Sequence, residues 1–170
     1  MKSNFEAALA HTLKHEGLFS DHPADPGGAT MKGITLAVFR AYKSNQHLTA
    51  EDLKRITDDE VRDIYKRKYW DPCRCDDLPP GVDVCVFDCA VNSGVGRSSK
   101  FLQECAGVQA DGVVGPVTLG VVRKLPPADI VNRMCDKRQT FLESLKTFAV
   151  FGKGWTRRVS EVRAFALKMI

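Results

Sequence analysis

Two carboxylates stand close together near the start of this chain, Glu16 and Asp25, followed by Gly27 and Gly28, where the backbone can turn tightly. Hydrolysis of a sugar bond commonly uses such a pair. One carboxyl protonates the leaving oxygen, and the other activates water or stabilises the oxocarbenium ion. Thr30 adds a short hydroxyl to the same loop. This run favours glycoside hydrolysis, although Asp-Pro-Gly-Gly is also typical of a plain turn.

A helix must position the first of these carboxylates. A capping box predicts that it begins at Ser3, and the two leucines that follow Phe5 at four-residue spacing form its apolar face. Eleven steps of about 100° bring Glu16 back to that face, and Gly17 then ends the helix. A carboxyl group on a buried face needs a partner or a raised pKa, and a raised pKa suits a general acid. The alternative is a slightly rotated helix with Glu16 in solvent.

These motifs resemble the signature of a phage-type N-acetylmuramidase family, small endolysins that cleave peptidoglycan. The likeness continues in the same order through nearly the whole chain. The matching segments are His15-Glu16-Gly17, Asp25-Pro26-Gly27-Gly28-Ala29-Thr30, Gly33-Ile34-Thr35, Tyr69-Trp70, residues 87–94, residues 102–103, residues 111–118, residues 138–141 and residues 151–155.

The resemblance implies a mainly α, lysozyme-like fold with a short β-hairpin near the active-site loop. It implies hydrolysis of the β-1,4 bond between N-acetylmuramic acid and N-acetylglucosamine, with Glu16 as the general acid. Asp25 and Thr30 fit the positions of a catalytic aspartate and threonine approximately, the threonine spacing being one residue short. The chain departs from the family pattern at Leu18, where many members have glycine, and at Met31, where they have asparagine.

Length and composition fit one soluble domain with two lobes. The chain has 170 residues, 44% apolar and 27% charged, which is ordinary for a globular protein. Pro79-Pro80-Gly81 is the clearest break. We therefore expect a catalytic lobe, residues 1–80, and a helical lobe, residues 81–170, in a single compact chain. Residues 111–118 resemble the loop of small peptidoglycan-binding modules, which implies wall binding by the second lobe.

Short helices with capped starts are predicted in the first half of the chain. Thr35, Thr49 and Thr57 each precede a helical segment, and the last two have an acidic residue three positions on, as a capping box does. The segment after Thr57 should end at Asp71-Pro72, because proline disfavours the helical conformation of the residue that precedes it.

Residues 83–92 are almost wholly apolar, which is typical of a helix buried on all sides. Asp88 and Asn92 lie four apart on one face of it. They either line the sugar cleft or brace a neighbouring helix. Tyr69 and Trp70 either stack on a sugar ring or belong to the core, as aromatic residues at a helix end usually do. We take all four as candidate substrate-binding residues.

Charge is uneven along the chain. Residues 1–120 hold 14 Lys and Arg against 17 Asp and Glu, whereas residues 121–170 hold 11 against 4, a net charge of +7. A basic C-terminal third favours peripheral contact with a polyanionic partner such as the bacterial envelope. No helix-turn-helix, zinc-finger or RNA-binding signature is present, so nucleic acid is not expected. The plainer alternative is a solvated basic face.

Cysteine and histidine allow other chemistry on composition alone. The six cysteines include the spacings of residues 73–75 and 85–89, which are not the usual zinc pairs, so buried free thiols are expected rather than disulfides. His11 and His15 share a helix face, but the His-Glu-x-x-His order of zinc hydrolases is missing. A cysteine nucleophile has no local signature. We therefore expect no metal and no cofactor.

No run is long enough to cross a membrane, and the amphipathic N-terminus, which carries Glu6, lacks the pattern of a signal peptide. We expect a monomer in the host cytoplasm that reaches the periplasm or cell wall with the help of a holin. Two other functions stay open. A lytic transglycosylase would use the same glutamate without water, and a non-catalytic module would bind peptidoglycan without clearing it.

Overall fold

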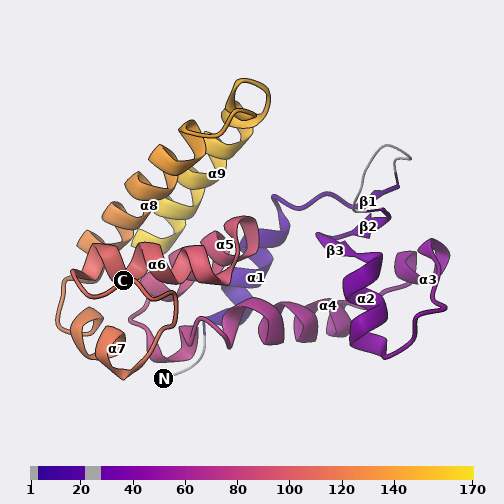
Figure 1. Ribbon diagram of the computed structural model, residues 1–170, viewed down its shortest axis with the longest axis horizontal. Helices are drawn as coiled ribbons and strands as arrows, with labels where there is room; N and C mark the ends of the chain where they lie inside the picture. Colours follow the sequence, from indigo (N-terminus) through magenta and orange to yellow (C-terminus); the bar gives the residue numbers. More distant parts are fainter. Residues whose placement is uncertain (1–3, 22–27) are drawn as a thin grey trace. The chain divides into compact units, whose positions relative to one another are not determined.

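The computed structural model describes residues 4–21 and 28–170, which form helices and one small sheet (Figure 1). The helices are α1 (Phe5–Leu13), α2 (Leu36–Lys43), α3 (Ala50–Lys54), α4 (Asp58–Tyr65), α5 (Val82–Ser93), α6 (Val95–Ala106), α7 (Pro116–Val122), α8 (Pro127–Glu143) and α9 (Phe148–Leu167). The strands are β1 (Phe19–Ser20), β2 (Thr30–Met31) and β3 (Ile34–Thr35). A π-helical turn, Lys66–Trp70, continues α4, and a 3₁₀ turn, Cys75–Asp77, precedes α5. The predicted mainly α, lysozyme-like fold with a short hairpin is confirmed.

Two compact units make up the chain. We call Leu9–Arg67 the sheet unit, and the residues up to Ala8 together with Lys68–Ile170 the helical unit. The sequence passes from the helical unit to the sheet unit after Ala8 and back to the helical unit after Arg67. The second of these boundaries precedes the break that was predicted at Pro79-Pro80-Gly81. A functional division at residue 80 stays a prediction.

The sheet unit contains a three-stranded antiparallel sheet. Its order is β1-β2-β3, with Thr30 opposite both Ser20 and Thr35. Lys32 and Gly33 connect β2 to β3, and both have positive φ, 49° and 75°. Type I′ hairpin turns require positive φ at both central residues. The hairpin of β2 and β3 was predicted from the sequence, whereas the additional strand β1, which pairs with β2, was not.

Threonine caps start the helices of the sheet unit, as predicted. Thr35 accepts a backbone hydrogen bond at the start of α2, and Thr49 and Thr57 form complete capping boxes with Asp52 and Glu60. These caps satisfy donors that the first turn leaves free, and so they set where each helix begins. The core consists of buried side chains from these helices, β3 and the loop after α3: Ile34, Phe39, Leu53, Ile56, Val61, Ile64 and Tyr65.

The helical unit is built around α5. Residues 81–90 are all buried, and α5 packs against α6, α8 and α9 (Figure 1). The rings of Phe5, Trp70 and Phe87 meet edge to face, with centroid distances of 5.2, 5.4 and 5.8 Å. The predicted all-round burial of this helix is confirmed, as is the helix end just before Asp71-Pro72. Within the described part of the chain, no helix combines the length and apolarity that a bilayer span requires.

Candidate active site

Glu16 follows α1 rather than ending it. The helix stops at Leu13, and the N–H groups of residues 14–16 donate to carbonyls three residues back, at 3.3, 3.0 and 3.2 Å. This tightened turn satisfies carbonyls that a helix end leaves free. The prediction that the helix extends to Gly17 is therefore wrong by about one turn. The capping box at Ser3 lies outside the described residues.

The Glu16 carboxylate lies against the turn between β2 and β3. A Cβ atom placed on Gly33 would come within 2.8 Å of Glu16 Oε2 and still closer to the Tyr65 hydroxyl. Gly33 also has a φ of +75°, which residues with a side chain rarely adopt. Glycine is therefore the residue that fits here. The turn, Glu16 and Tyr65 form one closely packed cluster within the sheet unit.

Tyr65 holds this turn from α4. Its side chain is buried, and its hydroxyl donates to the backbone oxygen of Lys32 at 2.8 Å. The Lys32 ammonium reaches Asp58 at 2.6 Å, and this hydrogen bond lowers the pKa of Asp58. The hairpin turn is thus tied to the first and last residues of α4. No role for Tyr65 was predicted from the sequence, although a buried tyrosine hydroxyl usually needs a partner.

The Glu16 carboxyl group is partly accessible and lies beside the hairpin turn. Its side chain is half-buried, so the carboxyl group is partly reachable from solvent while the backbone of the hairpin turn bounds it on one side. General acid catalysis depends first on holding the carboxyl within hydrogen-bond reach of the leaving oxygen. A tight glycine turn and a buried tyrosine supply that support.

The other two predicted catalytic residues are less defined. Thr30 lies in β2, two residues before the Lys32 turn position, is half-buried, and its hydroxyl donates to the Gly28 carbonyl at 3.4 Å. Asp25 lies outside the described residues. The pairing of Glu16 with Asp25 therefore stays a prediction, and Thr30 belongs to the same hairpin that supports Glu16.

Asp88, a candidate substrate-binding residue, is fully buried in the helical unit. Its Oδ1 accepts from Arg138 at 2.7 Å, and Arg158 binds both carboxylate oxygens at 2.9 to 3.2 Å. Burial by itself would raise the pKa of Asp88, but the two guanidinium groups outweigh it and hold the pKa well below 3.8. Asp88 thus links α5 to α8 and α9, which is the structural role left open by the sequence.

The other three candidates also belong to the helical unit. Trp70 is fully buried in its ring cluster, so it has no surface to offer a sugar. Asn92 is half-buried, and its Oδ1 accepts from the Ser93 hydroxyl at 3.2 Å. Tyr69 is half-buried. Only Asn92 and Tyr69 keep exposed surface, and their contacts with substrate stay predictions.

Gln103 organises the loop that was compared with peptidoglycan-binding modules. Its buried amide donates to Asp111 at 2.7 Å, to the Val113 carbonyl at 3.0 Å and to the Thr118 hydroxyl at 3.2 Å. Its amide oxygen accepts from the Gly112 N–H at 2.8 Å. The polar residues of this motif therefore hold the loop from within, and α7 begins at its first-turn proline as predicted.

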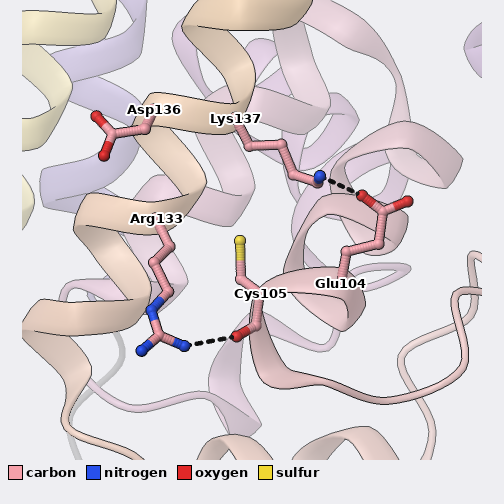
Figure 2. Close-up of a pocket in the computed structure, with 5 residues that line it drawn as sticks. All are labelled: Glu104, Cys105, Arg133, Asp136 and Lys137. Atoms are coloured by element: carbon pink, nitrogen blue, oxygen red, sulfur yellow. Dashed lines mark hydrogen bonds and ion pairs between the residues drawn. The ribbon is translucent and has the colours of Figure 1, made fainter.

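Two surface pockets lie beside Glu104 on α6. The first, of about 320 Å³, is lined by Glu104, Cys105, Arg133, Asp136 and Lys137 (Figure 2). Lys137 pairs with Glu104 at 2.8 Å, and Arg133 donates to the Cys105 carbonyl at 3.4 Å. The second, of about 480 Å³, is lined by Gly96, Arg97, Lys100, Phe101, Glu104, Asp111 and Gly112. Both pockets therefore offer charges of both signs.

Cys105, the cysteine at the first pocket, is not a reactive thiolate. All six are buried free thiols. Burial raises the pKa of Cys105, the cysteine that lines a pocket, to about 11, so it stays protonated at neutral pH and lacks the form that attacks a substrate. In the described ranges, no three His, Cys, Asp or Glu side chains are grouped so that they could hold a metal ion.

Residues 9–94, which include Glu16 and its hairpin, match the family described as Glycosyl hydrolase 108. The chain belongs to this family. As a member of glycosyl hydrolase 108 it is a glycoside hydrolase. Residues 97–160 match the family described as Predicted Peptidoglycan domain. The two matches together indicate a peptidoglycan-degrading enzyme, and the resemblance seen in the sequence motifs is confirmed.

The structure of SagA from Brucella abortus resembles this glycosyl hydrolase 108 member along its whole length. The two sequences are 45% identical, the match covers 99% of this chain and 97% of that one, and the TM-score is 0.88. No curated protein matches the sequence. Both matched regions of this chain therefore lie within the part that the similarity to SagA covers.

Proposed function

We propose that this glycosyl hydrolase 108 member is an N-acetylmuramidase that hydrolyses the β-1,4 bond between N-acetylmuramic acid and N-acetylglucosamine. Glu16 is the general acid. The observation that carries the proposal is the half-buried Glu16 carboxylate packed against a hairpin turn that admits only glycine at residue 33. Asp25 activates water or stabilises positive charge on the sugar ring, and Thr30 orients that water.

The peptidoglycan region supports binding of the wall. It includes both charged pockets on α6, and the peptide stems of peptidoglycan carry carboxylate and amino groups that such pockets complement. Asn92 and Tyr69 provide further polar and aromatic contacts to sugar. In a phage-type lysis role, the protein acts as a monomer whose access to the wall depends on a holin.

The test is a digestion of purified peptidoglycan by wild type and by Glu16→Gln, with the products read by mass spectrometry. Wild type should release fragments with reducing N-acetylmuramic acid ends. Glu16→Gln should fold normally and lose about 10²- to 10⁴-fold in rate, the usual contribution of general acid–base catalysis. Glu6→Gln, an exposed glutamate of α1, is the matched control and should keep full activity.

Other outcomes separate the alternatives. Products with 1,6-anhydro ends, lighter by one water, would make the protein a lytic transglycosylase. Binding to peptidoglycan with no soluble product from wild type would make it a binding module. Full activity of Glu16→Gln would remove Glu16 from the mechanism.

A further inference from the structure

The turn between α8 and α9 carries an exposed apolar patch. We call residues 144–155 the hairpin tip. Figure 1 shows α8 and α9 side by side, joined at the end that lies farthest from α7. Val150 and Phe151 of the tip are 74% and 54% exposed, respectively. Neighbouring exposed side chains of this size are a marker of an interaction surface.

The hairpin tip also contains aromatic rings that pack against one another. Trp155 contacts Phe148 and Phe151, with ring centroids 6.3 and 5.7 Å apart. The Phe148 ring lies on Gly152, where a Cβ atom would come within 2.8 Å of three ring carbons. Side chains of a helix tilt toward its N-terminus, so the first turn of α9 directs these groups toward the tip. The apolar patch is therefore a packed feature of the fold.

The charge around the patch is mainly positive. From Glu143 to Arg157 the sequence contains Lys146, Lys153 and Arg157 and a single acidic residue, Glu143, all of them exposed. Apolar and aromatic groups flanked by lysine are suited to the interface of an anionic bilayer, where the apolar groups enter the headgroup region and the ammonium groups meet lipid phosphates. Val150, which is more exposed than Phe151, offers a sugar neither a ring nor a polar atom.

We propose that the hairpin tip binds the surface of a bilayer that contains anionic phospholipid. Val150 and Phe151 enter the interface, and Lys146 and Lys153 contact the phosphate groups. This contact gives the basic C-terminal third a defined partner. It uses none of the residues assigned to hydrolysis, and it holds the enzyme at the membrane face that adjoins the wall.

Vesicle co-sedimentation of the full chain tests this proposal. The vesicles contain equal amounts of phosphatidylglycerol and phosphatidylcholine, or phosphatidylcholine alone. Wild type should bind the anionic vesicles at least about tenfold more strongly, and added salt should weaken that binding. V150S/F151S and K146E/K153E should each reduce it by about tenfold or more. Trp155 emission should shift to shorter wavelength on binding, because the ring leaves water.

Matched variants distinguish binding at the hairpin tip from nonspecific adsorption of the protein to vesicles. K124E/K168E makes the same charge change at the opposite end of the α8–α9 pair and should keep most of the binding. V117S removes a valine that is 73% exposed on α7 and should bind as wild type does. Thermal melts check that each variant is folded.

Several results would overturn the proposal. The first is wild type that does not bind anionic vesicles. The second is V150S/F151S that binds them as strongly as wild type does. The third is K124E/K168E that loses as much vesicle binding as K146E/K153E. Self-association of wild type that disappears in V150S/F151S, without vesicle binding, would make a second copy the occupant of the tip. The same samples are also assayed for peptidoglycan digestion, so a failure of the proposed hydrolase function is distinguished from a failure of membrane binding.

Discussion

Asp88 in the helical unit and Glu16 in the sheet unit are both carboxylates, and the fold uses them in opposite ways. Asp88 is fully buried between two arginines, whereas Glu16 is half-buried against a backbone turn. Two buried cations hold Asp88 in its charged form, which suits a brace and not a proton donor. Partial exposure beside a glycine turn is what the proposed role of Glu16 as a proton donor requires. Removing Asp88 should therefore damage stability, and removing Glu16 should damage activity.

The largest stability effect should come from Asp88→Asn. This change leaves Arg138 and Arg158 buried without the Asp88 countercharge, and among the described residues Nε and Nη2 of Arg138 already have no hydrogen-bond partner. Breaking a buried ion pair typically lowers the free energy of unfolding by about 3–5 kcal/mol. Urea denaturation followed by circular dichroism measures this loss.

Asp58→Asn is the matched control for that experiment. Asp58 is also paired, with Lys32, but its side chain is 92% exposed. Exposed pairs contribute little because water screens them. Equal losses in the two variants would contradict the contrast between a buried brace and a surface pair.

Gly33→Ala should damage both stability and activity. The added methyl group would displace the Glu16 carboxylate or the Tyr65 hydroxyl, and φ of +75° strains any residue with a side chain. We expect a loss of about 1–3 kcal/mol in unfolding free energy. Peptidoglycan clearing should fall at least about tenfold, because small displacements of a catalytic group are costly.

Two further variants sharpen this result. Gly107→Ala has the same backbone strain, with φ of +71°, but meets no atom within 4 Å, so it should reduce stability and leave clearing per folded molecule unchanged. Tyr65→Phe removes the hydroxyl that donates to the Lys32 carbonyl, and loss of that hydrogen bond should lower the unfolding free energy by about 0.5–1.5 kcal/mol. Normal clearing by Gly33→Ala would show that the turn does not position Glu16.

Acid should weaken the brace through Asp88. Its pKa in the folded protein is held below the ordinary 3.8, so the unfolded chain takes up the proton first as the pH falls. The stabilisation is fully present above about pH 5 and declines below about pH 4, by at most about 1.4 kcal/mol per pH unit. Urea denaturation from about pH 6 to about pH 2.5 should show the gap between wild type and Asp88→Asn narrowing. A constant gap would contradict the ion-pair account.

Local features of the fold were predictable from the sequence. Thr49 and Thr57 have their acidic partners three residues away, so both members of each cap are visible in a short window. The run of apolar residues in α5 likewise predicts that this helix is buried, because the whole run is visible in a short stretch of sequence. The hairpin followed from the family resemblance, but β1 did not, because a two-residue strand has no pattern until its partner is known.

The site required more than local pattern. The α1 helix ends at Leu13, a turn early, and the next three N–H groups donate to carbonyls three residues back instead of four. Tyr65 lies 33 residues from the carbonyl that it holds, and a buried tyrosine in a helix gives no sign of which backbone oxygen it will meet. Sequence reasoning therefore singled out the candidate proton donor and missed the residues that pack against it.

By itself, the sequence determined the family, the helical fold class, the capped helix starts and Glu16 as the candidate acid, since all of these reside in residue types at short spacing. Only the tertiary structure decided that Asp88 is a brace. Its partners, Arg138 and Arg158, lie 50 and 70 residues away. It also decided that Gly33 and Tyr65 support Glu16. Short spacing constrains the backbone directly, whereas distant partners meet only when packing of the core brings their elements together.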